Sequence, residues 1–472
     1  MSPTPTEPGA TGPRPPAAGR EGKREGSLEA PTRHPLDWRN PAFYDDAALT
    51  KELERVFDIC HGCRRCFSLC NSFPTLFDAV DATDSGEVHA VDRKVFWEVV
   101  DHCYLCDMCF MTKCPYVPPH PWNVDFPHLM LRAKAVRTRK EGISFRNRAL
   151  SATDTVGKIA GIPVLVEVVN AVNRSSAGRA VLEKTLGVDR TAPIPQYHSR
   201  TARKRLRRLG EADGADGPKV DGAGAVATAE TAGKVALFTT CYGNRNDPRI
   251  NEDLVAVFEH NDIPVTLVAQ ERCCGMPRLE LGDLESVARL KEHNIPQLLR
   301  ALDSGLDIVA PIPSCVLMFK QELPLMFPED ADVQRVAERI FDPFEYLMHR
   351  HRAGLLRTDF KRTLGKVSYH VPCHLRVQNI GLKTRDVLRL VPDTTVDAIE
   401  RCSGHNGTYG VKREFRAASL KIGRPVIQRV QSAAAQHYAS DCPMAGEQIE
   451  SGLEGGGEPE HPLTLLRLAY GI

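Results

Sequence analysis

The sequence predicts an α + α/β protein, in which an α-helical metal-binding domain precedes two α/β modules with parallel sheets. Two observations predict this class. Eight cysteines gather in two short runs between residues 60 and 114, and each run follows a helical pattern. Beyond residue 234, strands and helices alternate along the chain in two successive copies, which is typical of parallel sheets covered by helices.

The composition is that of a globular protein without a strong charge bias. The chain has 472 residues, of which 42% are hydrophobic, and its 61 Lys and Arg nearly balance its 60 Asp and Glu. No overall field would attract nucleic acid. Residues 1–40 are rich in Pro, Gly, Ala, Glu and Arg and have no apolar run. We therefore expect a disordered tail there, without a secretory signal, and a cytoplasmic protein.

The first cysteine run reads C-x2-C-x2-C-x3-C, and the second reads C-x2-C-x2-C-x4-C followed by Pro115. Three thiolates spaced in this way can converge on one cluster while the fourth reaches its neighbour. The runs therefore predict an α-helical ferredoxin domain over residues 41–145 that holds two [4Fe–4S] clusters. The predicted ligands are Cys60, Cys63, Cys66 and Cys114 for cluster 1, and Cys103, Cys106, Cys109 and Cys70 for cluster 2.

Zinc and disulfides are the alternatives for these cysteines. A zinc site needs four ligands, and a triple-cysteine run that occurs twice exceeds that need. Disulfide scaffolds are short secreted chains dense in cysteine, unlike this one. Thiolates are soft ligands that suit iron, so iron–sulfur clusters are favoured.

A helical connector and a flexible linker are expected over residues 146–233. Its most apolar stretch, residues 156–172, contains Lys158, Pro163 and Glu167 and is too short to span a bilayer. We expect a helix in the protein core there, with an interfacial helix on a membrane as the alternative. A basic run over residues 200–208 has no accompanying nucleic-acid fold, so we expect no nucleic-acid partner.

The two modules are expected over residues 234–352 and 353–472, and their cysteines recur with the strands. In open parallel sheets, residues that follow strands meet at one edge, where ligands bind. The sequence thus predicts a third site and a fourth site for metal. The candidate ligands are Cys241, Cys273, Cys274 and Cys315 in the first module, and Cys373, Cys402 and Cys442 in the second.

The motifs that follow these strands carry a family resemblance. They read CCGMP from Cys273, YHVPCHLR from Tyr369, RCSGH from Arg401 and DCP from Asp441. With them, residues 45–472 resemble the CCG cysteine-rich proteins related to heterodisulfide reductase and the C subunits of anaerobic glycerol-3-phosphate dehydrogenases. Ser403 departs from the family pattern, because it stands where the second cysteine of the doublet is expected. In the second module, His370, His374 or His405 could complete a metal site.

The resemblance implies an iron–sulfur electron-transfer subunit. A flavin-containing dehydrogenase subunit would donate electrons, which would pass through the two clusters to the CCG domains. The acceptor would be a quinone or a redox protein, such as a rubrerythrin-like peroxidase, with peripheral contact at the inner face of the cell membrane. One alternative is a disulfide-reducing catalytic subunit of the heterodisulfide reductase type. An alternative from another class is a zinc-binding interaction module with no redox role. In addition to the two clusters, the CCG domains could hold a further iron–sulfur cluster or zinc.

Overall fold

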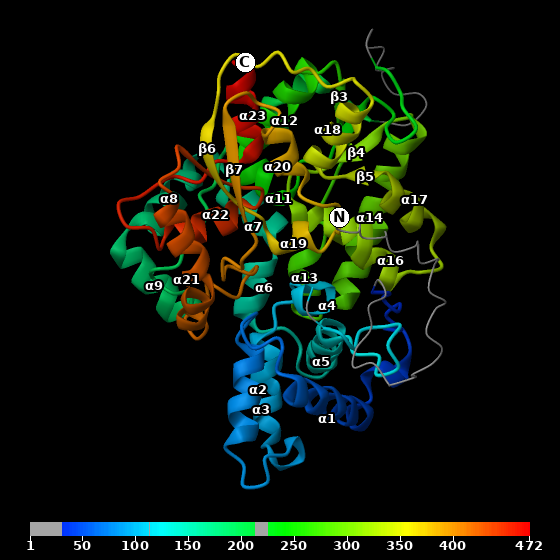
Figure 1. Ribbon diagram of the computed structural model, residues 1–472, viewed down its shortest axis with the longest axis vertical. Helices are drawn as coiled ribbons and strands as arrows, with labels where there is room; N and C mark the ends of the chain where they lie inside the picture. Colours follow the sequence, from blue (N-terminus) through cyan, green and yellow to red (C-terminus); the bar gives the residue numbers. More distant parts are fainter. Residues whose placement is uncertain (1–30, 113, 213–224) are drawn as a thin grey trace, which may run out of the picture.

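The computed structural model describes residues 31–112, 114–212 and 225–472. The N-terminal helices form one end of the molecule, and the two α/β modules lie together at the other end (Figure 1). The α + α/β class predicted from the sequence is confirmed, because both sheets are parallel and helices cover them.

The helices of the N-terminal region lead into the two cysteine runs, and the first long helix includes Cys60 and Cys63. Asp45 starts the first long helix by accepting the Ala48 N–H (2.7 Å). Arg64, with a φ of 51°, ends this helix directly after Cys63, and Cys103 directly follows the third helix. The region contains a 3-10 turn (Pro41–Tyr44), α1 (Asp46–Cys63), α2 (Ser72–Asp81), a second 3-10 turn (Val88–Ala90), α3 (Arg93–His102), α4 (Met108–Thr112) and α5 (Phe126–Glu141).

The first module contains a parallel sheet in the order β1-β3-β2-β4-β5. Its three central strands are buried along their whole length, as expected for a sheet covered on both faces. The strands are β1 (Glu211–Ala212), β2 (Val235–Leu237), β3 (Val265–Val268), β4 (Asp307–Val309) and β5 (Ile340–Phe341). The helices are α11 (Cys241–Arg245), α12 (Pro248–His260), α13 (Met276–Leu279), α14 (Leu284–Asp303), α15 (Pro313–Leu317), a π turn (Met318–Glu322), α16 (Leu323–Met326), α17 (Ala331–Arg339) and α18 (Pro343–Arg352).

The second module has a smaller parallel sheet, with three strands in the order β7-β6-β8. Its last helix returns to the first module, where Arg467 and Thr464 both donate to Asp253 (2.8 and 2.5 Å). The two modules are therefore docked against each other. The elements are β6 (Gly365–His370), α19 (Cys373–Arg376), α20 (Lys383–Leu388), β7 (Thr394–Ile399), α21 (Arg416–Ala433), β8 (His437–Ser440), α22 (Pro443–Glu450) and α23 (Pro462–Tyr470).

Residues 31–40 differ from the prediction of a disordered tail. Trp38 is 4% exposed, and its indole N–H donates to the Met326 carbonyl (3.0 Å). Arg33 donates to Asp107 (2.6 Å) and Asp125 (2.9 Å). These partners are distant in sequence, so local composition could not reveal them. The rest of the expected tail (1–30) and residues 213–224 of the expected linker lie outside the described residues.

The connector also differs from the prediction of a core helix. Residues 156–172 fall in two helices that are bent by 106°, and Val164 and Val168 are 83% and 56% exposed. The polar Asn170 instead faces inward and donates to the Tyr197 carbonyl (2.9 Å). Among the described residues, no single helix has the length and apolarity to cross a membrane. The connector contains α6 (Phe145–Ser151), α7 (Thr153–Ala160), α8 (Pro163–Arg174), α9 (Ser176–Leu186), α10 (Ala202–Arg205) and a 3-10 turn (Arg207–Leu209).

Candidate metal and electron-transfer site

The structure gathers the four cysteines predicted for cluster 1. Cys60, Cys63, Cys66 and Cys114 line one small cavity beside Phe73. Burial, followed by the other three thiols, raises the pKa of Cys60 well above its usual range. Four bare thiolates would therefore be unfavourable here, whereas iron would hold them deprotonated. The donor set fits a four-iron cluster.

The cysteines predicted for cluster 2 lie next to this group. Burial and the nearby Cys103 raise the pKa of Cys70 to about 12. Cys109 lies close to both Cys103 and Cys70, and also to Cys66 of the first group. The crossed pattern of the prediction thus agrees with the neighbours that the fold gives each thiol, and the two groups adjoin.

The loop that carries the second run is fixed from outside. Leu105 and Asp107 both adopt positive φ values (53° and 56°), which non-glycine residues seldom do. Arg33 holds the Asp107 carboxylate with two hydrogen bonds (2.6 and 3.0 Å), and the buried Lys134 ammonium donates to the Cys103 carbonyl. These contacts offset the strain of the turn and hold its backbone in place.

In the first module, four cysteines meet at the carboxyl edge of the sheet, as the strand pattern predicts. Hydrogen bonds link Cys273 to Cys241 and Cys274, and Cys274 to Cys315. The thiols of Cys241 and Cys274 donate to Cys273, which lowers its pKa well below the usual range. Asp154 of α7 accepts the Cys273 N–H (2.8 Å). Sequence reasoning missed Asp154, because only folding brings the connector to this edge.

The second module arranges its cysteines differently. Cys373 and Cys402 are hydrogen-bonded to each other, but the other thiol partner of Cys373 is Cys106 of the second cysteine run. Although the Cys373 thiol donates to Cys106, burial and neighbouring cysteines still raise the pKa of Cys106 to about 11. The Tyr104 hydroxyl lies 3.5 Å from the Cys402 sulfur. The second module therefore contacts Cys106, a predicted ligand of cluster 2, which the sequence did not reveal.

The three candidate histidines have different surroundings. His370 uses both ring nitrogens, one with the Ser440 hydroxyl and one with the Arg401 carbonyl (3.0 Å each), so its role is structural. His374 is hydrogen-bonded to Ser314 of the first module (2.8 Å). His405 is 8% exposed, and neither ring nitrogen has a partner. Of the three, His405 is thus the one with free ligand or hydrogen-bonding capacity.

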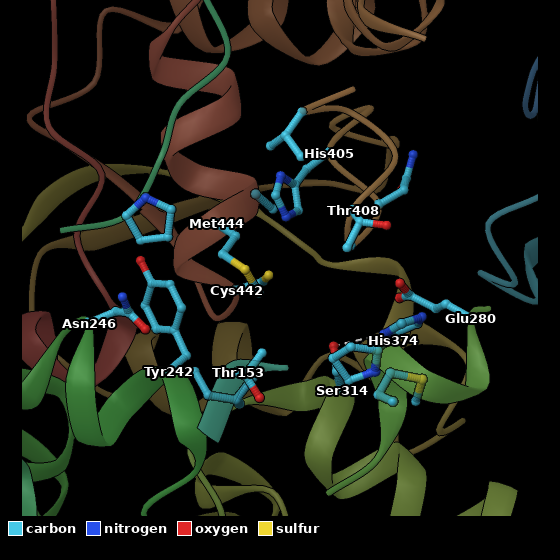
Figure 2. Close-up of a pocket in the computed structure, with 18 of the residues that line it drawn as sticks. Thr153, Tyr242, Asn246, Glu280, Ser314, His374, His405, Thr408, Cys442 and Met444 are labelled. Atoms are coloured by element: carbon cyan, nitrogen blue, oxygen red, sulfur yellow. Dashed lines mark hydrogen bonds between the residues drawn. The ribbon is translucent and has the colours of Figure 1, made fainter. Parts of the chain in front are cut away.

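A cavity of about 310 Å³ separates the two modules. His405, Cys442 and Met444 project from the second module toward Tyr242, Thr153 and Ser314 on the opposite side (Figure 2). The remaining lining includes cysteines of all three regions, namely Cys106, Cys241, Cys274, Cys315 and Cys373. Most other wall residues are apolar, such as Val156, Ile194 and Ile312, so the cavity suits a small organic molecule.

Two carboxyl groups in the cavity wall have pKa values close to neutrality. Burial raises the pKa of Glu447 to about 7, although the Tyr242 hydroxyl donates to it (2.8 Å) and opposes the shift. Burial also raises the pKa of Glu280 to about 7, against the opposing charges of Lys134 and Lys412. Such groups can both give and take a proton near pH 7.

Within the described ranges, no three or more His, Cys, Asp or Glu side chains come close enough to hold a single metal ion. A zinc ion requires its four ligands around one point, at about 2.3 Å for sulfur. The thiolates of a four-iron cluster bind different irons and lie farther apart.

Comparisons with known proteins match one stretch of the chain within each module. A family model for the CCG cysteine-rich domain matches residues 235–320 and 367–449. The C subunit of anaerobic glycerol-3-phosphate dehydrogenase from Escherichia coli (strain K12) is 27% identical over 340 residues, which cover 72% of this chain and 80% of the relative.

Two further relatives match shorter parts. Lactate utilization protein A of Bacillus pumilus is 25% identical over 219 residues, 44% of this chain and 87% of the relative. The B subunit of fumarate reductase (CoM/CoB) from Methanothermobacter marburgensis is 24% identical over 245 residues, 50% of this chain and 46% of the relative. The chain thus carries two CCG cysteine-rich domains and resembles the C subunit of anaerobic glycerol-3-phosphate dehydrogenase over most of its length.

Proposed function

We propose that this chain is an iron–sulfur electron-transfer subunit of an oxidoreductase. The observation that supports this most strongly is a continuous series of neighbouring thiols. It begins at the Cys60 group, continues through the close pair Cys66 and Cys109, and reaches Cys373 through Cys106. The series ends at the cavity between the modules. The relatives named as dehydrogenase and fumarate reductase subunits support the same class of function.

Two [4Fe–4S] clusters would supply one-electron chemistry, and the chain would hold, bury and orient them. A flavin-containing dehydrogenase subunit is the proposed donor. The proposed ligands are Cys60, Cys63, Cys66 and Cys114 for cluster 1, and Cys103, Cys106, Cys109 and Cys70 for cluster 2.

The CCG modules carry the remaining sites of the proposal. Cys241, Cys273, Cys274 and Cys315 are proposed to hold a further iron–sulfur cluster, because their thiols already contact one another. Cys373 and Cys402 adjoin cluster 2 instead, while Cys442 lines the cavity nearby. The cavity is the proposed place where a quinone, or a group presented by a redox protein, takes up the electrons.

Metal analysis of protein purified without oxygen tests this proposal. The two clusters require about eight irons per chain with matching sulfide. Cys106→Ser and Cys63→Ser should each remove about half of that iron, because each serine weakens a different cluster. Cys442→Ser serves as the matched control and should retain all of it. Zinc in a colourless protein would overturn the redox function, and unchanged iron in Cys106→Ser would overturn the ligand assignment.

We also propose that the connector contacts the membrane peripherally, at its cytoplasmic face. Four apolar side chains along this bend are each at least half exposed, namely Ile159 of α7, Ile162 between the helices, and Val164 and Val168 of α8. An apolar stripe with this exposure is typical of a helix that lies in a bilayer interface. Sedimentation with anionic lipid vesicles tests it: Val164→Asp should abolish binding. Phe67→Asp, at a similarly exposed apolar position in the cysteine loop, should not change it.

A further inference from the structure

A second cavity, also of about 310 Å³, lies beside the one between the modules. Its lining is mainly polar and includes Asp101, Lys134, Arg137 and Lys412. The two cavities adjoin, and four residues line both of them. The shared residues are Tyr104, Glu280, Asn406 and Thr408.

Among these shared residues, Glu280 is the one suited to exchange a proton at neutral pH. Burial raises the pKa of the other acidic group, Tyr104, well above its usual range. The Glu280 carboxylate accepts the Thr408 N–H, and Figure 2 shows it beside Thr408 at the cavity wall. Gly407 lies directly against this carboxylate, so that any side chain at position 407 would overlap it. The second module thus fixes a carboxyl group of the first.

The charged groups that face Glu280 come from two elements. Lys134 of α5 donates to the Glu280 carbonyl (3.3 Å), and Lys412 approaches from the second module. Both lysines lower the pKa of Glu280, while burial raises it, and the net value is about 7. Glu280 can therefore be protonated from the polar cavity and remain in exchange near pH 7.

The cavity between the modules already has hydrogen-bonding groups for an organic acceptor. The ring nitrogens of His405 are unpartnered, and His405 is more than nine-tenths buried. A quinone needs one proton for each of its two oxygens when it accepts two electrons. Electrons alone, delivered through the thiol-bound clusters, would leave a charged product in an apolar cavity, which is unfavourable.

We propose that Glu280 transfers protons from the polar cavity to a quinone-class acceptor bound between the modules. The inference rests on the proposed function, which supplies the electrons. The quinone takes up two electrons from the reduced clusters and two protons, and leaves as the hydroquinone. Glu280 gives up its proton to a quinone oxygen and is protonated again by water in the polar cavity.

Rapid mixing of the prereduced, cluster-loaded protein with two oxidants tests this role. Menadione needs protons for its reduction, whereas ferricyanide accepts one electron without a proton. Glu280→Gln should slow menadione reduction by about 10- to 100-fold and leave ferricyanide reduction unchanged. The wild-type menadione rate should fall above pH 7 as Glu280 loses its proton, and this dependence should disappear in Glu280→Gln. Glu280→Asp should restore part of the rate.

Binding and control measurements separate the possible failures. A fluorescent hydroxyquinoline N-oxide, used as a quinone analogue, should bind Glu280→Gln and wild type equally, because the rest of the site is intact. Glu285→Gln, at an exposed position nearby, should behave as wild type. If Glu280→Gln keeps the wild-type menadione rate and pH profile, the proton role of Glu280 is wrong. If the wild type reduces ferricyanide but neither binds the analogue nor reduces menadione, the quinone site itself is wrong.

Discussion

The two cysteine-rich modules repeat one sequence pattern, but their cysteines have different neighbours. In the first module, the hydrogen bonds between thiols stay within one group of four cysteines: Cys241, Cys273, Cys274 and Cys315. In the second, Cys373 turns toward Cys106 of the helical region. The first set is a closed group of four sulfurs, and the second is open toward a neighbouring domain.

One substitution and one docking contact account for this difference. The doublet Cys273-Cys274 of the first module corresponds to Cys402-Ser403 in the second, which therefore has one thiol fewer. The loop of Cys106 occupies the open side. A duplicated fold can thus keep its strands and turns while its sites diverge. In our proposal, the first module stores a metal centre and the second passes electrons to the cavity.

Metal content should respond most strongly to this difference. Cys274→Ser should remove the whole metal centre of the first module, because Cys274 joins two other thiols of the closed group. The corresponding change in the second module, Ser403→Ala, should leave the metal content per chain unchanged. Elemental analysis of anaerobically purified protein measures both. If the two variants lose equal amounts of metal, the modules do not differ in the way proposed here.

The next largest difference is expected in the stability cost of replacing the glycines that follow the two doublets. Gly275 and Gly404 both have positive φ (105° and 78°), which costs any other residue about 1–2 kcal/mol. A Cβ at Gly275 would meet only side chains, the nearest at 3.6 Å, whereas one at Gly404 would overlap the Ser419 carbonyl. Gly404→Ala should therefore add an overpacking cost of about 1–3 kcal/mol.

Thermal unfolding checks this order, with Gly275→Ala as the matched control for Gly404→Ala. The melting temperature should fall more for Gly404→Ala. An equal fall in both variants would mean that backbone strain alone decides the cost, and that the second module is no tighter at this turn than the first.

Acidification should act in opposite directions through two buried groups, His405 of the second module and Glu271 of the first. Burial lowers the pKa of His405 to about 4, so its neutral form stabilises the fold above pH 6.5, and this stability is lost as the pH falls toward 4. Burial raises the pKa of Glu271 in the first module to about 7. The stability that protonated Glu271 contributes to the fold is therefore present below pH 4.5 and is lost as the pH rises toward 7.

For His405, the loss between about pH 7 and pH 5 should be about 2 kcal/mol. His405→Gln should make thermal unfolding less dependent on pH over this range, because glutamine does not titrate. An unchanged pH dependence in this variant would show that His405 is not held neutral in the folded protein.

The sequence predicted those features that depend on local pattern. Strands such as Val265–Val268 and Thr394–Ile399 lie beyond residue 234, where the alternating pattern predicts strands, and every cysteine expected after a strand lies after one. The alternating apolar runs and the glycines after the doublets were enough to predict these strands and turns, because burial and turn geometry depend on neighbouring residues. The gathering of Cys60, Cys63, Cys66 and Cys114 around one cavity also agrees with their spacing, although their ligand role stays a prediction.

What the sequence could not predict depends on how the domains dock. The contact between Cys106 and Cys373 joins residues of two domains, and no local pattern encodes it. The same holds for Glu280, whose neighbours Gly407 and Lys412 belong to the other module. The apolar residues around Val164 were expected in the core, because periodicity shows that a helix has an apolar face but does not show what that face meets.

Loss of the ion pairs between the connector and each module should have the smallest effect on the stability of the fold. Arg146 pairs with Glu414 of the second module (2.5 Å), and Arg205 pairs with Glu252 of the first (3.0 Å). All four side chains are partly exposed, so water screens both pairs, and Arg146→Gln and Arg205→Gln should each cost about 0–1 kcal/mol. Melting temperatures at low and high salt measure this. A cost for Arg146→Gln that matches Gly404→Ala and persists in high salt would mean that the connector, rather than the turn at Gly404, makes the second module rigid.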